Sequence, residues 1–231
     1  MSSPTMMPMS LEEIAQAVQG RLIADTAAID TPVATSTFTD SRQIVEGSVF
    51  VAIAGERVDG HDYVSKVGAQ GAVVAIVDHE IDGAGVPQIV VEDTVLALGA
   101  LAKHNIERRR ALETPFTVIG ITGSVGKTTT KDLMKALLAH IGPTIAPVGS
   151  FNNEIGLPLT SLKVHAETRF LVAEMGANHV GEIANLTSLV PPDIAVVLKV
   201  GVAHLGEFGS PERIAQAKSE IIRGLVPGGL S

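Results

Sequence analysis

The segment around Lys127 holds the residues whose types and spacing most clearly indicate chemistry. A strand-like apolar run at 116–121 leads directly into Thr122-Gly123-Ser124-Val125-Gly126-Lys127-Thr128. In such a loop the glycines let backbone N–H groups curl around a phosphate, the lysine supplies a charge to the β- and γ-phosphates, and the threonine offers a hydroxyl to Mg²⁺. The common pattern asks for Gly where Ile121 stands. The strand, loop and helix context nevertheless favours a nucleoside-triphosphate site over an ordinary Gly-rich turn.

A metal bound to such phosphates also needs an acidic ligand. The apolar run at 170–173 ends in Glu174, so a neighbouring strand would deliver this carboxylate to the edge where an oxygen ligand for Mg²⁺ is wanted. Asp193 precedes its strand instead of ending it, and we expect it at the opposite edge. Glu174 is therefore the predicted metal ligand, in preference to a solvated strand end.

Two further residues are less specific. His204 follows the strand-like run at 193–200 by a short loop, so it is expected on the same edge as Lys127, where a neutral imidazole can ligate a metal. Lys218 lies inside a helix opened by Ser210 and by its spacing alone is a solvent-facing residue. Spacing alone singles out neither of them.

The elements that must position these residues follow a regular pattern after residue 115. Strand-like runs occur at 116–122, 144–148, 169–175 and 193–200, and they alternate with helical segments at 127–140, 180–189 and 211–225. This alternation predicts a parallel sheet covered on both faces. Functional residues are then expected at the carboxyl ends of its strands.

The first part of the chain predicts a small α/β domain. Ser10 and Glu13 form a capping-box pattern that opens a helix ending near Gly20. Buried strands are predicted at 49–53, 72–77 and 88–91, with helical segments at 61–70 and 93–110. The predicted divisions are a loose tail at 1–9, a first domain at 10–113 and a second at 114–231.

Composition and charge narrow the possibilities. The chain has 231 residues and no Trp. It also has no Cys, and this absence excludes a disulfide scaffold and a thiolate metal site. The net charge of -8 and the scarcity of aromatic residues argue against nucleic acid as a partner. Residues 1–113 hold 8 Lys/Arg and 16 Asp/Glu, whereas residues 114–231 hold 9 of each. The chain has no signal-peptide pattern and no apolar run of about 18–20 residues, so a cytoplasmic protein without a membrane span is expected.

Five blocks of the chain, together with its N-terminal segment, resemble the Mur ligase family. The five blocks are Gly123-Ser124-Val125-Gly126-Lys127-Thr128-Thr129, Ser150-Phe151-Asn152-Asn153-Glu154-Ile155-Gly156, Glu174-Met175-Gly176-Ala177-Asn178-His179, Ala203-His204-Leu205 and Ala217-Lys218-Ser219-Glu220-Ile221. In the N-terminal segment, Thr39-Asp40-Ser41-Arg42 and Gly60-His61-Asp62 are similar to the family's UDP-sugar-binding domain. The resemblance implies an α/β sugar-nucleotide domain followed by a parallel-sheet ATPase domain.

The resemblance also implies a role for each matched residue. ATP would be bound by Gly123, Ser124, Val125, Gly126, Lys127, Thr128, Thr129, Asn152 and Asn153. Metal ions would be held by Thr128, Glu174, His204 and Lys218, and the catalytic residues would be Lys127, Glu174, His204 and Lys218. Lys218 matches a lysine that many members carry as a metal-bridging carbamate. The UDP-muramoyl group would face Asp40, Ser41 and Arg42, and Asn178 and His179 would lie near the peptide or the second substrate.

The blocks are most similar to the family members that use ATP and Mg²⁺ to join D-alanyl-D-alanine to UDP-N-acetylmuramoyl-tripeptide. The implied mechanism passes through an acyl phosphate and needs no protein nucleophile. A monomeric chain is expected. Lys199 stands where the family often has Asn, and the chain stops where the central domain should continue, before a C-terminal domain. Little or no ligase activity is therefore expected from these residues alone.

Three alternatives stay open at this point. A sister Mur ligase or a folylpolyglutamate-type ligase would share the phosphate loop but use another acceptor amine. A nucleotide-dependent switch is a second class, although no Asn-Lys-x-Asp base-reading motif is present. The third is a non-catalytic module in which residues 1–113 bind a nucleotide sugar.

Overall fold

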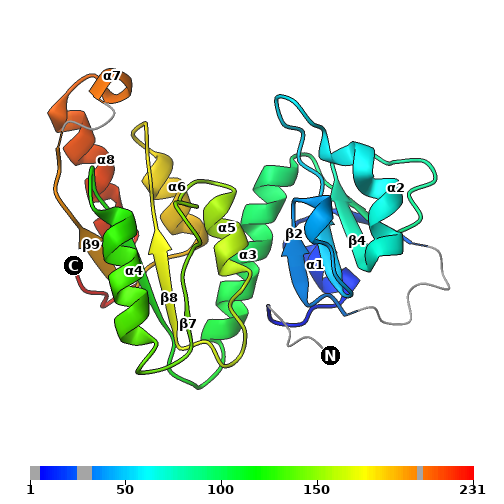
Figure 1. Ribbon diagram of the computed structural model, residues 1–231, viewed down its shortest axis with the longest axis horizontal. Coiled ribbons are helices and arrows are strands. Elements are labelled where there is room, and N and C mark those ends of the chain that lie inside the picture. Colours follow the sequence, from blue (N-terminus) through cyan, green and yellow to red (C-terminus); the bar gives the residue numbers. More distant parts are fainter. Residues whose placement is uncertain (1–5, 25–32, 202–204) are drawn as a thin grey trace. The chain divides into compact units, whose positions relative to one another are not determined.

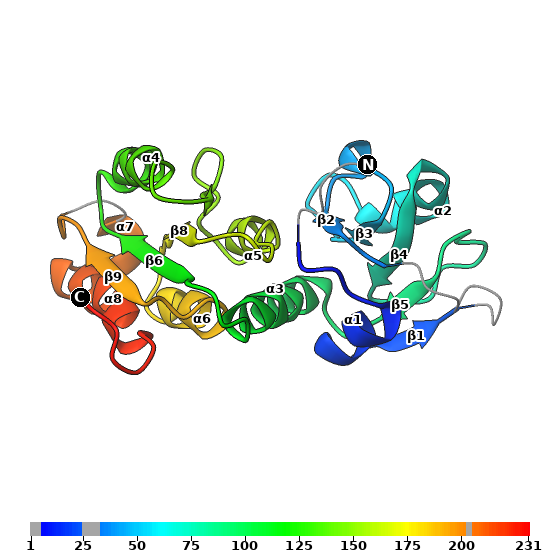
Figure 2. The same ribbon diagram turned by 90° about the horizontal axis from the view of Figure 1, so that it is seen from below.

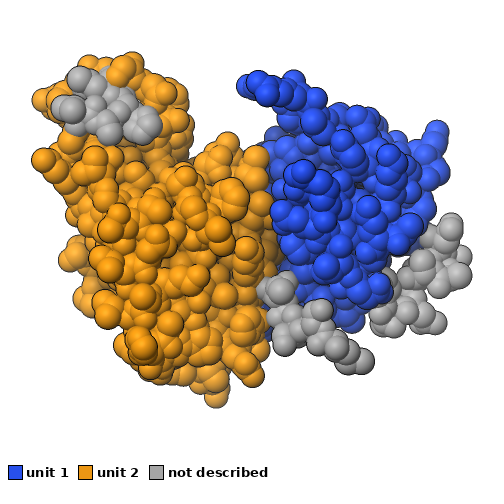
Figure 3. Space-filling view, viewed as in Figure 1, with its two compact units in different colours: residues 1–105 blue, residues 106–231 orange. Residues whose placement is uncertain are grey.

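The computed structural model describes residues 6–24, 33–201 and 205–231. The chain divides into two compact units, Met1–Asn105 (unit 1) and Ile106–Ser231 (unit 2), shown in different colours in Figure 3. The division falls inside helix α3 (Thr94–Arg110). The predicted domain boundary at 113/114 lies after this helix.

The described residues of unit 1 form a five-stranded mixed sheet. In chain order the strands are β1 (Arg21–Ile23), β2 (Ser36–Phe38), β3 (Ser48–Val51), β4 (Ala72–Val77) and β5 (Gln88–Val90). Across the sheet they lie in the order β1-β5-β4-β3-β2, and only β1, at the edge, is antiparallel to its neighbour. The central strands β3 and β4 are almost wholly apolar and buried, as expected for parallel strands covered on both faces.

Helices cover both faces of this sheet. Helix α2 (Val64–Val67) lies between the short 3₁₀ turns η3 (Gly60–Tyr63) and η4 (Gly68–Gln70), and it packs its valines against Phe50 and Ala75. Helix α1 (Leu11–Ala17) lies on the other side of the sheet in Figure 2. The Ser10 hydroxyl accepts a hydrogen bond from the Glu13 N–H at 3.2 Å, which confirms the predicted start of α1.

The prediction of a loose tail at 1–9 is wrong for residues 6–9. Met6 and Met9 are buried, the Met6 N–H donates to the Thr35 carbonyl, and Met9 forms an antiparallel bridge with Ala34. Methionine suits such buried positions, because a flexible thioether side chain adapts to irregular gaps. The composition of the segment, with Pro4 and Pro8, does not reveal this long-range pairing.

The described residues of unit 2 form a four-stranded, fully parallel sheet. Its strands are β6 (Thr117–Thr122), β7 (Thr144–Ile145), β8 (Phe170–Glu174) and β9 (Ile194–Val197), arranged in the order β7-β8-β6-β9. The predicted parallel sheet is confirmed. Because β6 lies between β8 and β9, the loop that follows it opens at the point where the strand order reverses, which is where ligands bind in open α/β sheets.

Two hydrophobic layers hold this sheet. On one face, Ile119, Ile121 and Val172 pack with Met134 and Leu138 of α4 (Lys127–Leu138). On the other face, alternate strand residues pack against α6 (Glu182–Leu189) and α8 (Pro211–Arg223). Figure 2 shows these two helices on the side of the sheet opposite α4. The remaining helices are α5 (Gly156–Ser161) and the short α7 (Leu205–Phe208); Figure 1 labels them.

Helix α8 shows how the sequence sets this packing. Ser210 caps its N-terminus by accepting from the Arg213 N–H at 3.3 Å, and Pro211 occupies the first turn, where it needs no hydrogen-bond donor. Ile214, Ala217 and Ile221 follow at intervals of three and four residues and are buried on one face. In the described parts of the chain, no helix is both long and apolar enough to cross a membrane.

Candidate functional site

The loop between β6 and α4 has a backbone shape that its glycines permit. Gly126, the N-cap residue directly before α4, adopts a φ of +86°, and Gly123 adopts a φ of +154°. A Cβ atom on Gly123 would lie 2.8 Å from the Leu198 Cβ atom, so a side chain there would collide with the segment after β9. The loop therefore leads its backbone into the N-terminus of a helix, an arrangement that attracts anions.

Two side chains at the start of α4 make defined contacts. The Lys127 ammonium donates to the Gly123 carbonyl at 2.8 Å and so curls back over the loop. The Thr128 hydroxyl donates to Oε2 of Glu174 at 3.1 Å. The predicted pairing of loop and acidic residue is thus present as a direct contact between Thr128 and Glu174.

Glu174 is the buried acid of this site. It ends β8, where its backbone pairs with Ile121 of β6, two residues before the loop begins at Gly123. It is 1% exposed, and its second oxygen, Oε1, accepts from the Asn152 side-chain amide at 2.9 Å. A carboxylate and a hydroxyl beside a helix N-terminus are hard oxygen donors, which fits Mg²⁺ held together with phosphate oxygens.

The side chains of Asn152 and Asn153 make different contacts. Asn152 faces Glu174, and its carbonyl accepts from the Gly176 N–H at 2.9 Å. Asn153 turns the other way, since its side-chain oxygen accepts from the Gly156 N–H at 2.9 Å and so supports the start of α5. The structure therefore brings Asn152 into contact with Glu174, whereas Asn153 makes the local turn contact typical of an asparagine pair.

The other predicted loop residues are spread around the same backbone. The Ser124 hydroxyl accepts from the Gly201 N–H at 3.0 Å, and the Ser124 N–H donates to the Lys199 carbonyl at 2.9 Å. Val125 and Thr129 are exposed. These contacts tie the loop to the segment that follows β9, and Lys199 contributes to them through its backbone.

Lys131 is a buried lysine that the motif analysis missed. Its ammonium donates to the carbonyls of Pro147 and Gly149 at 3.0 and 2.9 Å and pairs with Asp132 at 2.9 Å. It thereby anchors the segment that leads to Asn152 onto the helix that begins with Lys127. A mid-helix lysine is usually a solvated residue; the signal that could have found it is its position one turn after Lys127, on the same face of α4.

Lys218 does not face solvent, so the expectation from its spacing alone is wrong. It is 3% exposed, its ammonium lies 5.6 Å from the Phe208 ring centre, and it is 3.4 Å from the Ala177 carbonyl. Burial, together with the positive charge of Lys127, lowers the pKa of Lys218 to about 8, while Glu182 and Glu220 act in the opposite direction. His204 lies outside the described residues.

The loop before α6 contains the predicted residues Asn178 and His179. Both are exposed, and the Asn178 N–H donates to the Glu182 carboxylate at 2.8 Å. Glu220 of α8 accepts from the N–H groups of Gly181 and Ala184 at 2.7 and 3.0 Å, so it caps α6 from a neighbouring helix. Sequence reasoning missed this capping role, because Glu220 lies far from α6 along the chain.

Asp193 lies at the opposite edge of the sheet, as predicted. Its Oδ2 atom accepts from the Val118 N–H at 2.7 Å, near the start of β6. Its carboxylate also binds Arg110 through two nitrogen atoms, at 2.9 Å each. This acid holds the ends of β6 and α3 and takes no part in the phosphate-loop cluster.

In unit 1, Asp40, Ser41 and Arg42 lie together at the turn η2 (Ser41–Gln43), which Asp40 caps. Arg42 binds Asp40 through two nitrogen atoms, at 2.9 and 2.7 Å, and its guanidinium lowers the pKa of the Asp40 carboxyl to about 2. They line an open pocket of about 440 Å³. Its other lining residues are Thr39, Phe50, Ile53, Val58, Gly60 and Tyr63.

Both units match family models. Residues 35–106 match the model described as the Mur ligase family, catalytic domain, and residues 121–231 match the Mur ligase middle domain.

The chain is also similar to complete proteins and their structures. The UDP-N-acetylmuramoyl-tripeptide–D-alanyl-D-alanine ligase of Mycobacterium tuberculosis (strain ATCC 25618 / H37Rv) is 44% identical over 238 residues, which cover 94% of this chain and 46% of that ligase. A crystal structure of MurF from Acinetobacter baumannii superposes with a TM-score of 0.86 at 41% identity, over 98% of this chain and 48% of that one. The crystal structure of MurF from Thermotoga maritima in complex with ADP superposes with a TM-score of 0.73 at 38% identity, over 82% of this chain and 43% of that one. The chain spans about half the length of the curated relatives it matches.

Proposed function

This chain belongs to the Mur ligase family, and from that premise we propose that it forms the sugar-nucleotide-binding and ATP-binding parts of a UDP-N-acetylmuramoyl-tripeptide–D-alanyl-D-alanine ligase. The observation that carries the proposal is the contact between Thr128 and the buried Glu174 at the mouth of a phosphate loop. Relatives with that activity are 37–44% identical over most of the chain.

In the proposed reaction the protein works by positioning and by neutralising charge. The loop from Gly123 to Thr129 would bind the ATP phosphates through backbone N–H groups, and the Lys127 ammonium would leave the Gly123 carbonyl for the transferred phosphate. Thr128 and Glu174 would hold Mg²⁺, which when bound neutralises phosphate charge. Asn152 would keep the Glu174 carboxylate oriented.

The bond changes we propose follow from this arrangement. The terminal carboxylate of the UDP-linked peptide attacks the γ-phosphorus of ATP, which forms an acyl phosphate and releases ADP. The amine of D-alanyl-D-alanine then attacks the acyl carbon, phosphate leaves, and the amine loses a proton as the amide bond forms. No protein nucleophile is required, so the contribution of the chain is orientation and electrostatic stabilisation.

Lys218 is proposed as a second functional lysine of unit 2. Because burial lowers its pKa to about 8, more of this lysine is a neutral amine near neutral pH than is usual, and only a neutral amine reacts with CO₂ to form a carbamate. The carbamate would carry a negative charge and could hold a metal. His204 completes the proposed metal ligands, and Asn178 and His179 are proposed to face the peptide or the acceptor.

The pocket of unit 1 is proposed to bind the UDP-muramoyl group. Because the sequence up to residue 113 is net acidic, the overall field opposes an anionic ligand, and binding must depend on Arg42, Ser41 and nearby backbone donors. Ile53 and Tyr63, which are partly exposed, offer apolar surface in the same pocket. A cytoplasmic location is part of the same proposal, since ATP is a substrate supplied inside the cell. A monomeric state is proposed with it, as a separate assumption that size measurements in solution would test.

Equilibrium binding tests this function without relying on turnover. Calorimetry of the 231-residue chain should detect ATP binding that strengthens with Mg²⁺ and, in a separate titration, UDP-N-acetylmuramoyl-tripeptide binding. We expect UDP-N-acetylmuramic acid without peptide to bind at least about 10-fold more weakly, because it lacks the peptide that Asn178 and His179 are proposed to face. Sugar-nucleotide binding without ATP binding would instead favour a non-catalytic module, and equal affinity for both sugar nucleotides would favour another ligase of the family.

A further inference from the structure

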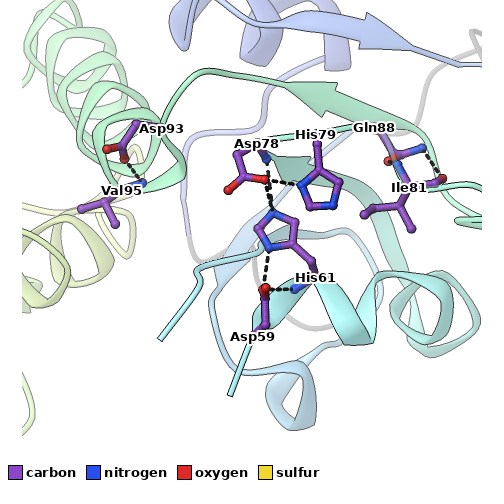
Figure 4. A network of polar contacts seen from close by, with 8 residues as sticks. All are labelled: Asp59, His61, Asp78, His79, Ile81, Gln88, Asp93 and Val95. Carbon is purple, nitrogen blue, oxygen red and sulfur yellow. Dashed lines mark hydrogen bonds and ion pairs between the residues drawn. The ribbon is translucent and has the colours of Figure 1, made fainter. Parts of the chain in front are cut away.

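Unit 1 contains a cluster of two histidines and an aspartate that the proposed ligase reaction does not use. His61 lies in η3, and Asp78 and His79 follow the end of β4; Figure 4 shows the three side chains turned toward one another. The side-chain ligand atoms of all three lie within 4.8 Å of one another. The two imidazole rings stack with their centres 4.8 Å apart and their planes 25° from parallel. Because an imidazole binds a metal in its own ring plane, the exposed His79 ring would have to turn out of this stack for both histidines to bind one ion.

His61 is the fixed member of this cluster. Its side chain is 4% exposed, and its Nδ1 atom lies 2.6 Å from Oδ1 of Asp59. The same Asp59 oxygen accepts from the His61 backbone N–H at 2.9 Å, so the carboxylate is itself held in place. A carboxylate that accepts from one ring nitrogen leaves the other, Nε2, as the basic nitrogen.

The segment that carries Asp78 and His79 is also held on the protein. The Asp78 N–H donates to His61 Nε2 at 3.2 Å. Three residues further on, the side-chain amide of Gln88 donates to the Ile81 carbonyl at 3.1 Å and accepts from the Ile81 N–H at 2.9 Å. Gln88 is buried in β5, so it anchors this turn to the sheet (Figure 4). The candidate ligands therefore start from a partly organised arrangement.

We propose that His61, Asp78 and His79 form a binding site for a divalent transition metal of the Zn²⁺ class. The ligand atoms are Nε2 of His61, Oδ1 of Asp78 and Nδ1 of His79. In a tetrahedral Zn²⁺ site with bonds of about 2.0–2.2 Å, ligand atoms lie about 3.4 Å apart. His61 Nε2 and Asp78 Oδ1 are already 3.2 Å apart, and His79 Nδ1 contacts the same oxygen of Asp78.

The ligand set selects the kind of metal. Two imidazole nitrogens with one carboxylate oxygen suit Zn²⁺, Ni²⁺ or Cu²⁺, whereas Mg²⁺ prefers oxygen atoms alone. Asp59 supplies the outer carboxylate that commonly orients a metal-binding histidine. A bound metal would replace the Asp78 N–H as the partner of His61 Nε2. It would also take the place of a proton on His79 Nδ1. The fourth coordination position would be left for water.

Metal binding here has a structural consequence for the neighbouring pocket. Gly60, which lies between Asp59 and His61, lines the pocket that also contains Asp40 and Arg42. A metal that joins η3 to the end of β4 would therefore restrain one wall of that pocket. The inference does not depend on the proposed ligase function, because it concerns residues to which that reaction assigns no role.

Zn²⁺ binding by the tag-free 231-residue chain tests the inference. In competition with a chromophoric chelator, we expect one Zn²⁺ per chain, unaffected by excess Mg²⁺. The variants His79→Ala and Asp78→Asn should each weaken Zn²⁺ binding at least about 10-fold, and Asp59→Asn should weaken it about 10–100-fold. His79 and Asp78 are exposed, so these variants should keep the fold, which circular dichroism checks.

His104→Ala is the matched control. This histidine is also in unit 1 and also pairs with a carboxylate, that of Glu13 at 2.8 Å, but it lies outside the cluster. Its replacement should leave the affinity for Zn²⁺ unchanged. Equal affinity of the wild-type chain and His79→Ala, or no bound Zn²⁺ at all, would overturn the inference and leave the cluster as a hydrogen-bonded clip between η3 and β4.

Co²⁺ gives a second readout at the same site. A four-coordinate Co²⁺ bound by nitrogen and oxygen ligands should give visible absorption that is lost in His79→Ala and retained in His104→Ala. An unchanged spectrum in His79→Ala would count against the proposed ligands. Neither measurement uses ATP or a sugar nucleotide, so failure of the metal site and failure of the proposed ligase function would be distinguishable.

Discussion

The phosphate-loop site of unit 2 and the pocket of unit 1 are built in opposite ways. In unit 2 the acid is buried, and the backbone supplies a helix N-terminus bounded by glycines. In unit 1 the charged residues are on the surface: the Arg42 side chain is 87% exposed and pairs with Asp40 two residues away. The first site is assembled from several distant segments, whereas the charges of the second come from one short turn.

This difference indicates how each site would meet an anion. The sequence of unit 2 is nearly neutral, with 12 Lys/Arg and 11 Asp/Glu, so phosphate binding relies on preorganised N–H groups and on Lys127. Unit 1 is acidic, and Arg42 must share its guanidinium between Asp40 and a ligand. Substitutions in unit 2 should therefore change binding or stability strongly, and substitutions of the surface pair in unit 1 should act locally.

A large effect on ATP binding is expected from Glu174→Gln. The amide keeps the shape of the side chain but removes the negative charge that would hold Mg²⁺ beside Thr128. We expect the affinity for ATP in Mg²⁺ to fall about 100-fold, or about 2.7 kcal/mol, with a much smaller change in EDTA. Calorimetry measures both. Glu154→Gln, which replaces an exposed acid of the same unit, is the control. An equal loss of ATP affinity in the two buffers would argue against a metal role for Glu174.

Asp193→Asn should separate the two edges of the unit 2 sheet. Asn cannot maintain the charged pair with Arg110, so the free energy of unfolding should fall by about 2 kcal/mol. This loss is smaller than the about 3–5 kcal/mol typical of a fully buried pair, because both side chains are partly exposed. Urea unfolding measures this loss. The affinity for ATP of the folded variant should not change, and a large loss of affinity would show that this edge contributes to the site.

Lys218 gives a pH-dependent test of the buried lysine. Its pKa is lowered to about 8, so between pH 8 and its ordinary value of 10.5 the folded chain has released a proton that the unfolded chain still holds. This contribution makes stability rise with pH in that window, and the cost of the buried charge is fully present below it. Relative to Lys218→Met, the wild-type chain should gain on the order of 1–3 kcal/mol between pH 7 and 10.

The measurement for Lys218 is urea unfolding of both proteins in CO₂-free buffer, at several pH values across this range. Comparing the two removes pH effects from all other groups. A stability difference that stays constant with pH would mean that the pKa of Lys218 is not lowered in the folded chain.

The smallest effect on the free energy of unfolding is expected from Arg42→Ala. The exposed pair should contribute little to the free energy of unfolding, but loss of the guanidinium should raise the pKa of Asp40 from about 2 toward its ordinary value of 3.8. An NMR titration of the Asp40 carboxyl carbon measures the shift. Arg57→Ala, an exposed arginine of the same unit, should leave this pKa unchanged; an equal shift in both variants would point to the general charge of unit 1.

Much of this fold was predictable because its signals are local. The parallel strands of unit 2, the cap of α1 and the position of Glu174 follow from apolar runs, capping residues and strand ends. The edge strands β1 and β2 and the helix α5 were missed, since each is short and takes its stability from its neighbours. Burial of Met6, Lys131 and Lys218 depends on partners distant in sequence, such as Thr35, Pro147 and Ala177, which no local pattern reveals.

The most direct test of the account is a pair of titrations on three proteins. The wild-type chain, Lys127→Met and Arg42→Ala are each titrated calorimetrically with ATP in Mg²⁺ and, separately, with UDP-N-acetylmuramoyl-tripeptide. We predict that Lys127→Met loses ATP binding by at least about 100-fold and keeps sugar-nucleotide binding, while Arg42→Ala weakens only the sugar nucleotide, by about 10-fold. If Lys127→Met bound ATP as tightly as the wild-type chain, the assignment of the phosphate loop would be contradicted.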